Sequence, residues 1–245
     1  ATGARITHRN VVRVYDILTG MSYDPEGKGT EVHVISMEFV DGPHLRRLAE
    51  TSDPPLRENT TQALAYFRQI CAGVAAAHDQ GVVHRDLKPE NIMLDREAGI
   101  LKVADFGLAY FLERDPEDDV WDTRTRMTMG TVAYMPPEQG KDAKRVVASG
   151  DVFSLGRILY ELIIGSLPDG VFTPASKQNK TLPESMDTVI ATCLQTKPED
   201  RFQSATDLLA AFDAAVAEME ADEPSVVGAD RRTEVEEVPA AVAAA

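Results

Sequence analysis

The chain has 245 residues and a formal net charge of −15, and this acidic excess excludes a general nucleic-acid-binding protein. Its length is enough for one large domain, or for two small lobes and a tail. The two cysteines, Cys71 and Cys193, lie far apart and outside any CxxC motif, so we expect reduced core thiols. We expect no signal peptide and no membrane segment in a chain that is cytoplasmic, or that forms the cytoplasmic part of a larger membrane-anchored protein.

The first part of the chain predicts two strands followed by two helices. Residues 5–18 and 31–40 carry alternating apolar runs, and we predict paired strands there. Between them, residues 19–30 contain three glycines and a proline and predict a long hairpin loop. A short helix is expected over 44–50. A longer one is expected over 60–79, where apolar residues recur at helical spacing and a glycine follows the end.

The second part predicts a tight strand pair and then helices. Residues 92–94 and 100–104 read as short apolar strands around a turn. Residues 151–164 form a strongly apolar helical segment, and two further helices are expected at 186–194 and 205–216.

The residues that carry chemistry surround the predicted strand pair. Residues 83–91 read V-H-R-D-L-K-P-E-N, with Asp86, Lys88 and Asn91 in one loop, and Asp105 follows the second strand. The turn between the strands returns Asp105 to the side of Asn91. Phosphoryl transfer needs such a set, because a carboxylate orients the attacking hydroxyl, a cation meets the phosphoryl group and oxygen ligands hold Mg²⁺.

The pattern H-R-D-L-K-P-E-N followed by D-F-G resembles the catalytic and metal loops of bacterial eukaryotic-like (Hanks-type) serine/threonine protein kinases. The resemblance runs from about residue 8 to about residue 212, and it includes G-T-V-A-Y-M-P-P-E-Q, D-V-F-S-L-G and P-E-D-R-F in family order. It implies an α+β, protein-kinase-like fold with a mostly α-helical C-lobe. The expected division is a two-stranded N-lobe remnant with the hinge (1–40), a C-lobe (41–217) and an acidic, Ala-rich disordered tail (218–245).

The resemblance implies a role for each residue of the catalytic loop. Asp86 would orient the substrate hydroxyl and accept its proton, and Lys88 would neutralise charge on the transferring γ-phosphoryl group. Asn91 and Asp105 would bind Mg²⁺ through oxygen. The implied cofactors are therefore ATP and Mg²⁺, and Asp86, Lys88 and Asn91 are the candidate catalytic residues.

The resemblance also implies a nucleotide site at the end of the second strand. Met37 would be the gatekeeper at the back of the adenine pocket. Glu38 to Val40 would be the hinge, whose backbone groups hydrogen-bond the adenine edge. The candidate cofactor-binding residues are Met37, Glu38, Val40, Lys88, Asn91 and Asp105.

Two implied interactions are structural. Glu138 and Arg201 would form a buried ion pair that ties the activation segment to the large lobe. Asp151 would accept hydrogen bonds from the backbone around His84 and Arg85 and brace the catalytic loop.

Specificity for serine and threonine follows from two positions of the resemblance. Lys88 stands where tyrosine kinases usually lose the lysine, and Thr131 is placed to hydrogen-bond Asp86 and Lys88. The implied partners are protein substrates with Ser or Thr, with no nucleic acid.

An arginine before the catalytic aspartate goes, in this family, with phosphorylation of the activation segment. Arg85 would receive the phosphate. Thr123, Thr125 and Thr128 are the candidate sites, and the chain would self-associate for phosphorylation in trans.

A second class stays open. The family's glycine-rich loop, strand lysine and helix glutamate precede His8 in family order, and residues 1–7 contain none of them. Gly27 to Gly29 cannot substitute, because they lie in the predicted hairpin loop. We expect the chain either to be a piece of a kinase, inactive or weakly active alone, or to be a non-catalytic kinase-like module that binds proteins.

Overall fold

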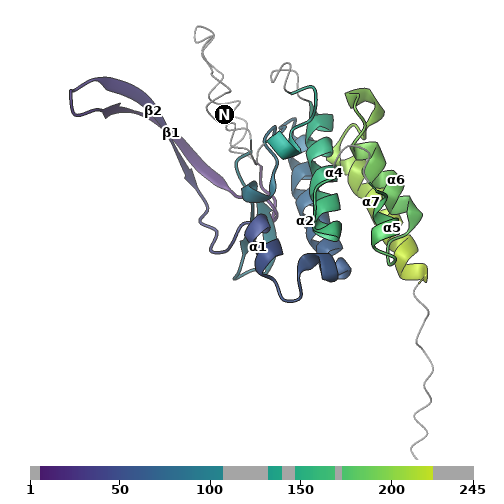
Figure 1. The fold of residues 1–245 in the computed structure, drawn as a ribbon. Helices are drawn as coiled ribbons and strands as arrows, with labels where there is room; N and C mark the ends of the chain where they lie inside the picture. Colours follow the sequence, from purple (N-terminus) through teal and green to yellow (C-terminus); the bar gives the residue numbers. More distant parts are fainter. Residues whose placement is uncertain (1–5, 107–131, 140–146, 169–172, 223–245) are drawn as a thin grey trace, which may run out of the picture.

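A computed structural model describes residues 6–106, 132–139, 147–168 and 173–222 of the chain. A two-stranded ribbon projects from one side of a mainly helical body (Figure 1). In chain order the elements are β1 (Val14–Tyr23), β2 (Gly29–Met37), α1 (Leu45–Thr51), α2 (Thr60–His78), β3 (Ile92–Asp95), β4 (Ile100–Val103), α4 (Ala148–Ile164), α5 (Ala175–Gln178), α6 (Glu184–Cys193) and α7 (Ala205–Asp222), with 3₁₀ turns at Leu56–Glu58, Pro89–Asn91, Val132–Tyr134 and Pro198–Asp200.

The ribbon corrects one prediction. The expected loop over 19–30 is wrong, because β1 continues to Tyr23 and β2 begins at Gly29. The turn is short because the Asp24 carboxylate accepts N–H bonds from two and four residues further on, at 3.0 and 2.8 Å, and Gly27 adopts φ +83°. The other two glycines that favoured a loop, Gly20 and Gly29, are accommodated in β1 and β2, because strand pairing needs only backbone groups.

The ribbon is joined to the body only at its base within the described residues. β1 and β2 pair with each other in a separate two-stranded sheet. Just before β1, Val12 N–H donates to the Val103 carbonyl at 2.9 Å. Several large apolar side chains of the ribbon are consequently exposed, namely Tyr15, Leu18, Met21, Tyr23, Val34 and Met37.

The body is built around α2 and α4. The predicted helix over 60–79 is confirmed, and its N-terminus is capped by Asn59, whose side chain accepts the Gln62 N–H at 3.1 Å. α2 buries its apolar stripe against α4 and α7, and the rings of Phe67 and Phe212 lie 4.9 Å apart. α4 is buried along nearly its whole length between α2 and α6, as its lack of a polar face predicts.

β3 and β4 form the predicted tight hairpin, and its two faces contact different parts of the molecule. Ile92, Leu101 and Val103 are fully buried in the main core with α2. Met93 and Lys102 are paired across the strands and lie on the opposite face, because alternate strand residues point to opposite sides. This second face carries the candidate nucleotide site.

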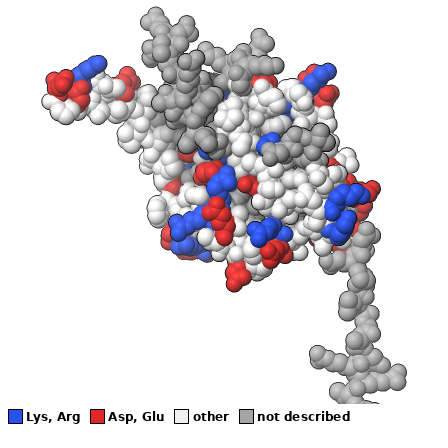
Figure 2. Space-filling model, in the orientation of Figure 1, with Lys and Arg blue, Asp and Glu red and all other residues white. Residues whose placement is uncertain are grey.

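The expected α+β, mostly helical architecture is confirmed. At the C-terminal end, α7 continues to Asp222, so the first residues of the expected tail (218–245) are helical, and residues 223–245 lie outside the described part. None of the helices in the described ranges is long and apolar enough to cross a bilayer. On the face shown in Figure 2, acidic and basic side chains lie in small mixed groups.

Candidate active site

The catalytic loop brings together the three residues that the sequence selected. Lys88 Nζ donates to Asp86 Oδ2 at 2.8 Å. Asn91 Nδ2 donates to the Asp86 backbone carbonyl at 2.8 Å and lies 3.3 Å from the same Oδ2 atom. The short 3₁₀ turn Pro89–Asn91 makes this possible, because it folds Asn91 back over Asp86. The second carboxylate oxygen of Asp86 receives neither of these two bonds, and it is the atom that can orient a hydroxyl.

Asp151, near the start of α4, holds this loop from below. Its carboxylate accepts the N–H groups of His84 and Arg85 at 2.7 and 2.8 Å, as predicted. His78, at the end of α2, contacts Oδ2 of the same carboxylate through Nε2 at 2.9 Å. Arg85 has φ +68°, a strained conformation for a non-glycine residue, and the two Asp151 bonds hold the backbone that leads into it.

His84 joins the catalytic loop to the second candidate loop. Its Nδ1 accepts the Asp86 N–H at 3.3 Å, so Nε2 carries the proton and donates to the Ala104 carbonyl at 2.9 Å. The His84 ring also packs against Phe106, with centroids 4.8 Å apart. Asp105, between Ala104 and Phe106, is therefore fixed on both sides by one buried histidine.

The two candidate metal ligands lie at the adjoining ends of β3 and β4. Asn91 precedes β3 and Asp105 follows shortly after β4, and Ala104 N–H donates to the Asn91 carbonyl at 2.8 Å. Asn91 donates its Nδ2 to Asp86, so its Oδ1 points away from Asp86. Asp105 is exposed and has a backbone φ of +63°. An amide oxygen and a carboxylate are ligands that suit Mg²⁺, which keeps several of its own waters. The donor set fits that ion.

The hinge residues follow directly from β2. Met37 ends the strand, and Val40 is buried in a small apolar cluster separate from the main core, with Val12, Ala104 and Met93. Met37, Glu38 and Val40 were selected from the sequence. Val12, Ala104 and Met93 were missed, because a single apolar residue in each of three separate segments leaves no periodic signal.

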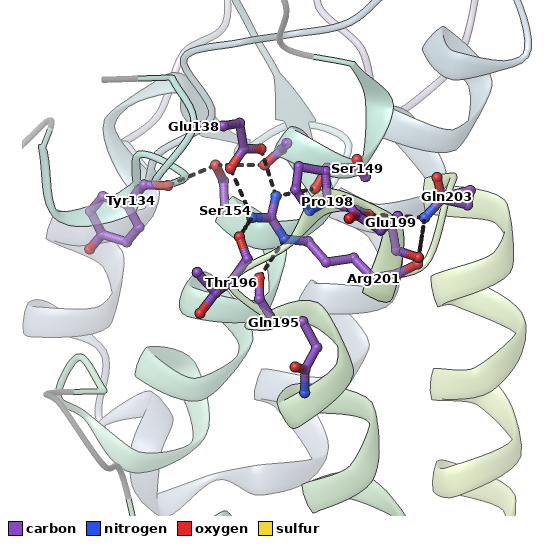
Figure 3. A network of polar contacts seen from close by, with 11 residues as sticks. Tyr134, Glu138, Ser149, Ser154, Gln195, Thr196, Pro198, Glu199, Arg201 and Gln203 are labelled. Carbon is purple, nitrogen blue, oxygen red and sulfur yellow. Dashed lines mark hydrogen bonds and ion pairs between the residues drawn. The ribbon is translucent and has the colours of Figure 1, made fainter. Parts of the chain in front are cut away.

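Glu138 and Arg201 form the predicted pair. Two guanidinium nitrogens of Arg201 bind the two oxygens of Glu138 at 2.7 and 2.8 Å (Figure 3). The same guanidinium donates to the backbone carbonyls of Gln195, Ser149 and Thr196 at 2.7 to 3.1 Å. Each guanidinium nitrogen of this fully buried cation thus has a hydrogen-bond acceptor, as a buried charge requires.

Comparison with known proteins identifies the family. A model described as "Protein kinase domain" matches residues 2–212, most of the chain and the whole of the site. The chain belongs to the protein kinase domain family. The resemblance to bacterial Hanks-type serine/threonine kinase domains is confirmed by the relatives of this chain.

The kinase domain is similar to curated bacterial serine/threonine kinases. It is 32% identical to PrkC of Bacillus subtilis, over 87% of this chain and 33% of that protein. It is 32% identical to PknB of Mycolicibacterium smegmatis, over 97% of this chain and 38% of that protein. The chain therefore spans about a third of the length of these relatives. A crystal structure of the Mycobacterium tuberculosis PknI kinase domain superposes with a TM-score of 0.62 at 22% identity, covering 87% of this chain and 75% of that one, which shows the shared fold.

A second polar network of the kinase domain was not expected from the sequence. Arg46 of α1 contacts Glu90 of the catalytic loop at 2.5 Å, Glu161 of α4 at 3.3 Å and the Tyr134 hydroxyl at 2.8 Å. Burial opposes the charge of Arg46, but these hydrogen bonds outweigh it and raise the pKa of the guanidinium. The network ties α1 to the loop that carries Asp86.

The activation-segment residues selected from the sequence lie outside the described part of the kinase domain. These are Thr123, Thr125, Thr128 and Thr131. Their predicted roles in phosphorylation and specificity stay predictions.

Proposed function

We propose that this chain is the catalytic large lobe of a serine/threonine protein kinase, which transfers the γ-phosphoryl group of ATP to Ser or Thr side chains of proteins. The observation that carries the proposal is the Asp86 carboxylate. One of its oxygens accepts hydrogen bonds from Lys88 and Asn91, and its other oxygen receives neither of these bonds. A second carboxylate, that of Asp105, lies in the adjoining loop after β4. A site for a hydroxyl, a phosphoryl group and a cation uses this full set.

In the proposed mechanism Asp86 orients the substrate hydroxyl and accepts its proton as the oxygen attacks. Lys88 lies 2.8 Å from Asp86, so its charge falls on the phosphoryl oxygens next to the attacking group. Asn91 and Asp105 would hold Mg²⁺, which neutralises phosphate charge when it is bound. The reaction needs no covalent intermediate on the protein, so the contribution of these residues is positioning and electrostatic stabilisation.

The nucleotide would lie between the hinge and the apolar cluster of Val12, Val40, Met93 and Ala104. Its adenine edge would meet the backbone of Glu38 and Val40, with Met37 behind it. Apolar walls with a few backbone partners are typical of such a pocket.

Protein substrates and association for phosphorylation in trans are part of the proposal, as is a cytoplasmic location, either of the whole protein or of the cytoplasmic part of a larger membrane-anchored protein. The support is the similarity to curated bacterial serine/threonine kinases. Because the chain spans only part of their length, the activity of the whole protein must itself be tested.

The test uses the protein expressed from its full coding sequence, with ATP, Mg²⁺ and a generic basic protein. Asp86→Asn preserves shape and removes the base, and should lower kcat by at least ~100-fold. Asp213→Asn is the matched control, since it removes an exposed carboxylate on α7 that pairs with Arg68, away from the site. Asp105→Asn should raise the Mg²⁺ concentration needed for activity. Undiminished transfer by Asp86→Asn would contradict the proposal.

The second candidate is a non-catalytic kinase-like module that binds proteins. Such a module would use the helical large lobe to bind proteins without phosphoryl transfer. It predicts that the protein from the full coding sequence binds a partner but transfers no phosphoryl group, with Asp86→Asn leaving the binding unchanged.

A further inference from the structure

Lys102 of β4 is nearly buried, with 9% of its surface exposed, and a lysine in such a position needs charged partners. It is paired with Met93 on the neighbouring strand. Directly opposed residues of an antiparallel pair share one face, so Lys102 lies on the face that Met93 contributes to the hinge cluster. The helical core is on the other face.

Lys102 has two carboxylate partners, from different parts of the chain. Its Nζ binds the Glu38 carboxylate in the hinge and lies 3.1 Å from Asp95 Oδ2 at the end of β3. Asp95 is itself anchored, because its other oxygen accepts the Ala98 N–H in the β3–β4 turn at 3.1 Å. Burial opposes the charge on Lys102, but the hydrogen bonds that it donates to Glu38 and Asp95 outweigh this effect and raise the pKa of the ammonium. The bridge is therefore charged at neutral pH.

The bridge also decides how the Glu38 backbone is used. Glu38 N–H donates to the Arg13 carbonyl at 2.8 Å. In a regular antiparallel pair Arg13 N–H would return a bond to the Glu38 carbonyl. Here it donates to the Glu38 carboxylate, at 3.1 Å. Among the described residues no backbone hydrogen bond ends on the Glu38 carbonyl or starts from Val40 N–H.

The strand that holds the hinge also leads into the metal loop. Ala104 and Asp105 follow Lys102 by two and three residues, and Ala104 is bonded to Asn91. A nucleotide must reach the hinge backbone and the Asp105 carboxylate at the same time. The short strand β4 thus positions both groups. Preorganisation of this kind lowers the ordering cost of binding.

We propose that Lys102 is a positioning residue, which fixes the hinge relative to the metal loop through its ion-pair bridge to Glu38 and Asp95 and presents the Glu38 carbonyl and Val40 N–H to the adenine edge. This inference rests on the proposed function for its nucleotide, but the bridge itself can be tested without one.

Hydrogen exchange of the nucleotide-free chain tests the bridge. Lys102→Met keeps the length of the side chain and removes the charge, and should speed exchange of the Glu38 N–H, which is bonded to the Arg13 carbonyl, by at least about tenfold. Lys28→Met is the matched control, because Lys28 is an exposed lysine at the ribbon turn, and should leave this exchange unchanged. Equal exchange in wild type and Lys102→Met would overturn the proposal.

A second variant guards against misfolding. If Lys102→Met melts with a broad, non-cooperative transition, Glu38→Gln replaces it, because Lys102 then keeps Asp95 as a partner. Glu38→Gln should loosen residues 38–40, and Asp95→Asn, which retains the turn bond, should do so less. No loosening in Glu38→Gln would overturn the proposal.

Kinetics of the full-length protein separate this inference from the proposed function. Lys102→Met should raise KM for ATP by ~5- to 20-fold with kcat within about twofold, and Lys102→Arg should restore most of the loss. A fall in kcat at unchanged KM would overturn the positioning role. If the wild-type protein transfers no phosphoryl group, the proposed function fails, while the hydrogen-exchange result still decides the bridge.

Discussion

Arg201 donates hydrogen bonds to both oxygens of the Glu138 carboxylate, at 2.7 and 2.8 Å, although the two residues lie 63 positions apart in the chain. The guanidinium also lies over the ring of Phe153, 4.9 Å from its centroid. Glu138 lies near the end of a described segment that begins at residue 132, and Arg201 lies between α6 and α7. The pair therefore connects the segment after the activation loop to the helical body.

Removing Arg201 should destabilise this body. Arg201→Ala leaves Glu138 and three backbone carbonyls without their donor, and loss of one partner of a buried pair costs ~3–5 kcal/mol. In a domain of this size the melting temperature should fall by at least about 6 °C. Arg57→Ala is the control, because Arg57 pairs with Glu58 on the surface, with side chains 56% and 57% exposed. A melting temperature within about 1 °C of wild type would contradict the expectation.

The same pair should give stability a defined pH dependence. Burial raises the pKa of Glu138, but its hydrogen bonds with Arg201 outweigh that effect and hold the pKa below the ordinary glutamate value. A pKa that is lower in the folded state stabilises above the unfolded value, and that stability is lost as the pH falls through the folded value.

The stability difference between wild type and Glu138→Gln should therefore narrow from about pH 7 to about pH 3. Urea unfolding at a series of pH values measures it. Glu58→Gln, on the surface, should show little difference at any of them. A difference for Glu138→Gln that stays constant down to about pH 3 would mean that ionisation of this carboxyl does not contribute.

Phosphorylation is expected at the activation-segment threonines, Thr123 and Thr125 before Thr128, with Arg85 as the receptor for the phosphate. Mass spectrometry of the protein expressed from its full coding sequence should find phosphate there, and Asp86→Asn should abolish it. The double variant T123A/T125A should lose most of the incorporated phosphate. Phosphate confined to sites outside residues 115–131 would refute this expectation.

A polypeptide of these 245 residues alone should bind ATP weakly and transfer little phosphate to a generic basic protein. The proposed hinge and the proposed Mg²⁺ ligands are present, but phosphate recognition draws largely on a glycine-rich backbone and a paired lysine. The protein expressed from its full coding sequence should show stronger transfer. Robust transfer by these residues alone that Asp86→Asn abolishes would show that another residue replaces the strand lysine.

Much of this architecture was determined by the sequence by itself. The helices over 60–79 and 151–164 and the tight pair β3–β4 are predictable because periodic apolar residues and local caps report on segments that fold against one core. The cluster Asp86, Lys88 and Asn91 is predictable because its members are neighbours in one loop. The ribbon turn was misplaced because glycine content does not reveal that strand pairing can continue through it.

Only the tertiary structure decided how distant side chains meet. Lys102 and Glu38 are 64 positions apart, and Arg46 and Glu161 are 115 apart, so no periodicity or local spacing links them. Such contacts depend on the angle at which the ribbon and α1 dock on β3, β4 and α4, and that angle is set by packing of the whole core. The sequence by itself therefore determined which groups are candidates for the chemistry, whereas the packing decided which buried charges lie against those groups.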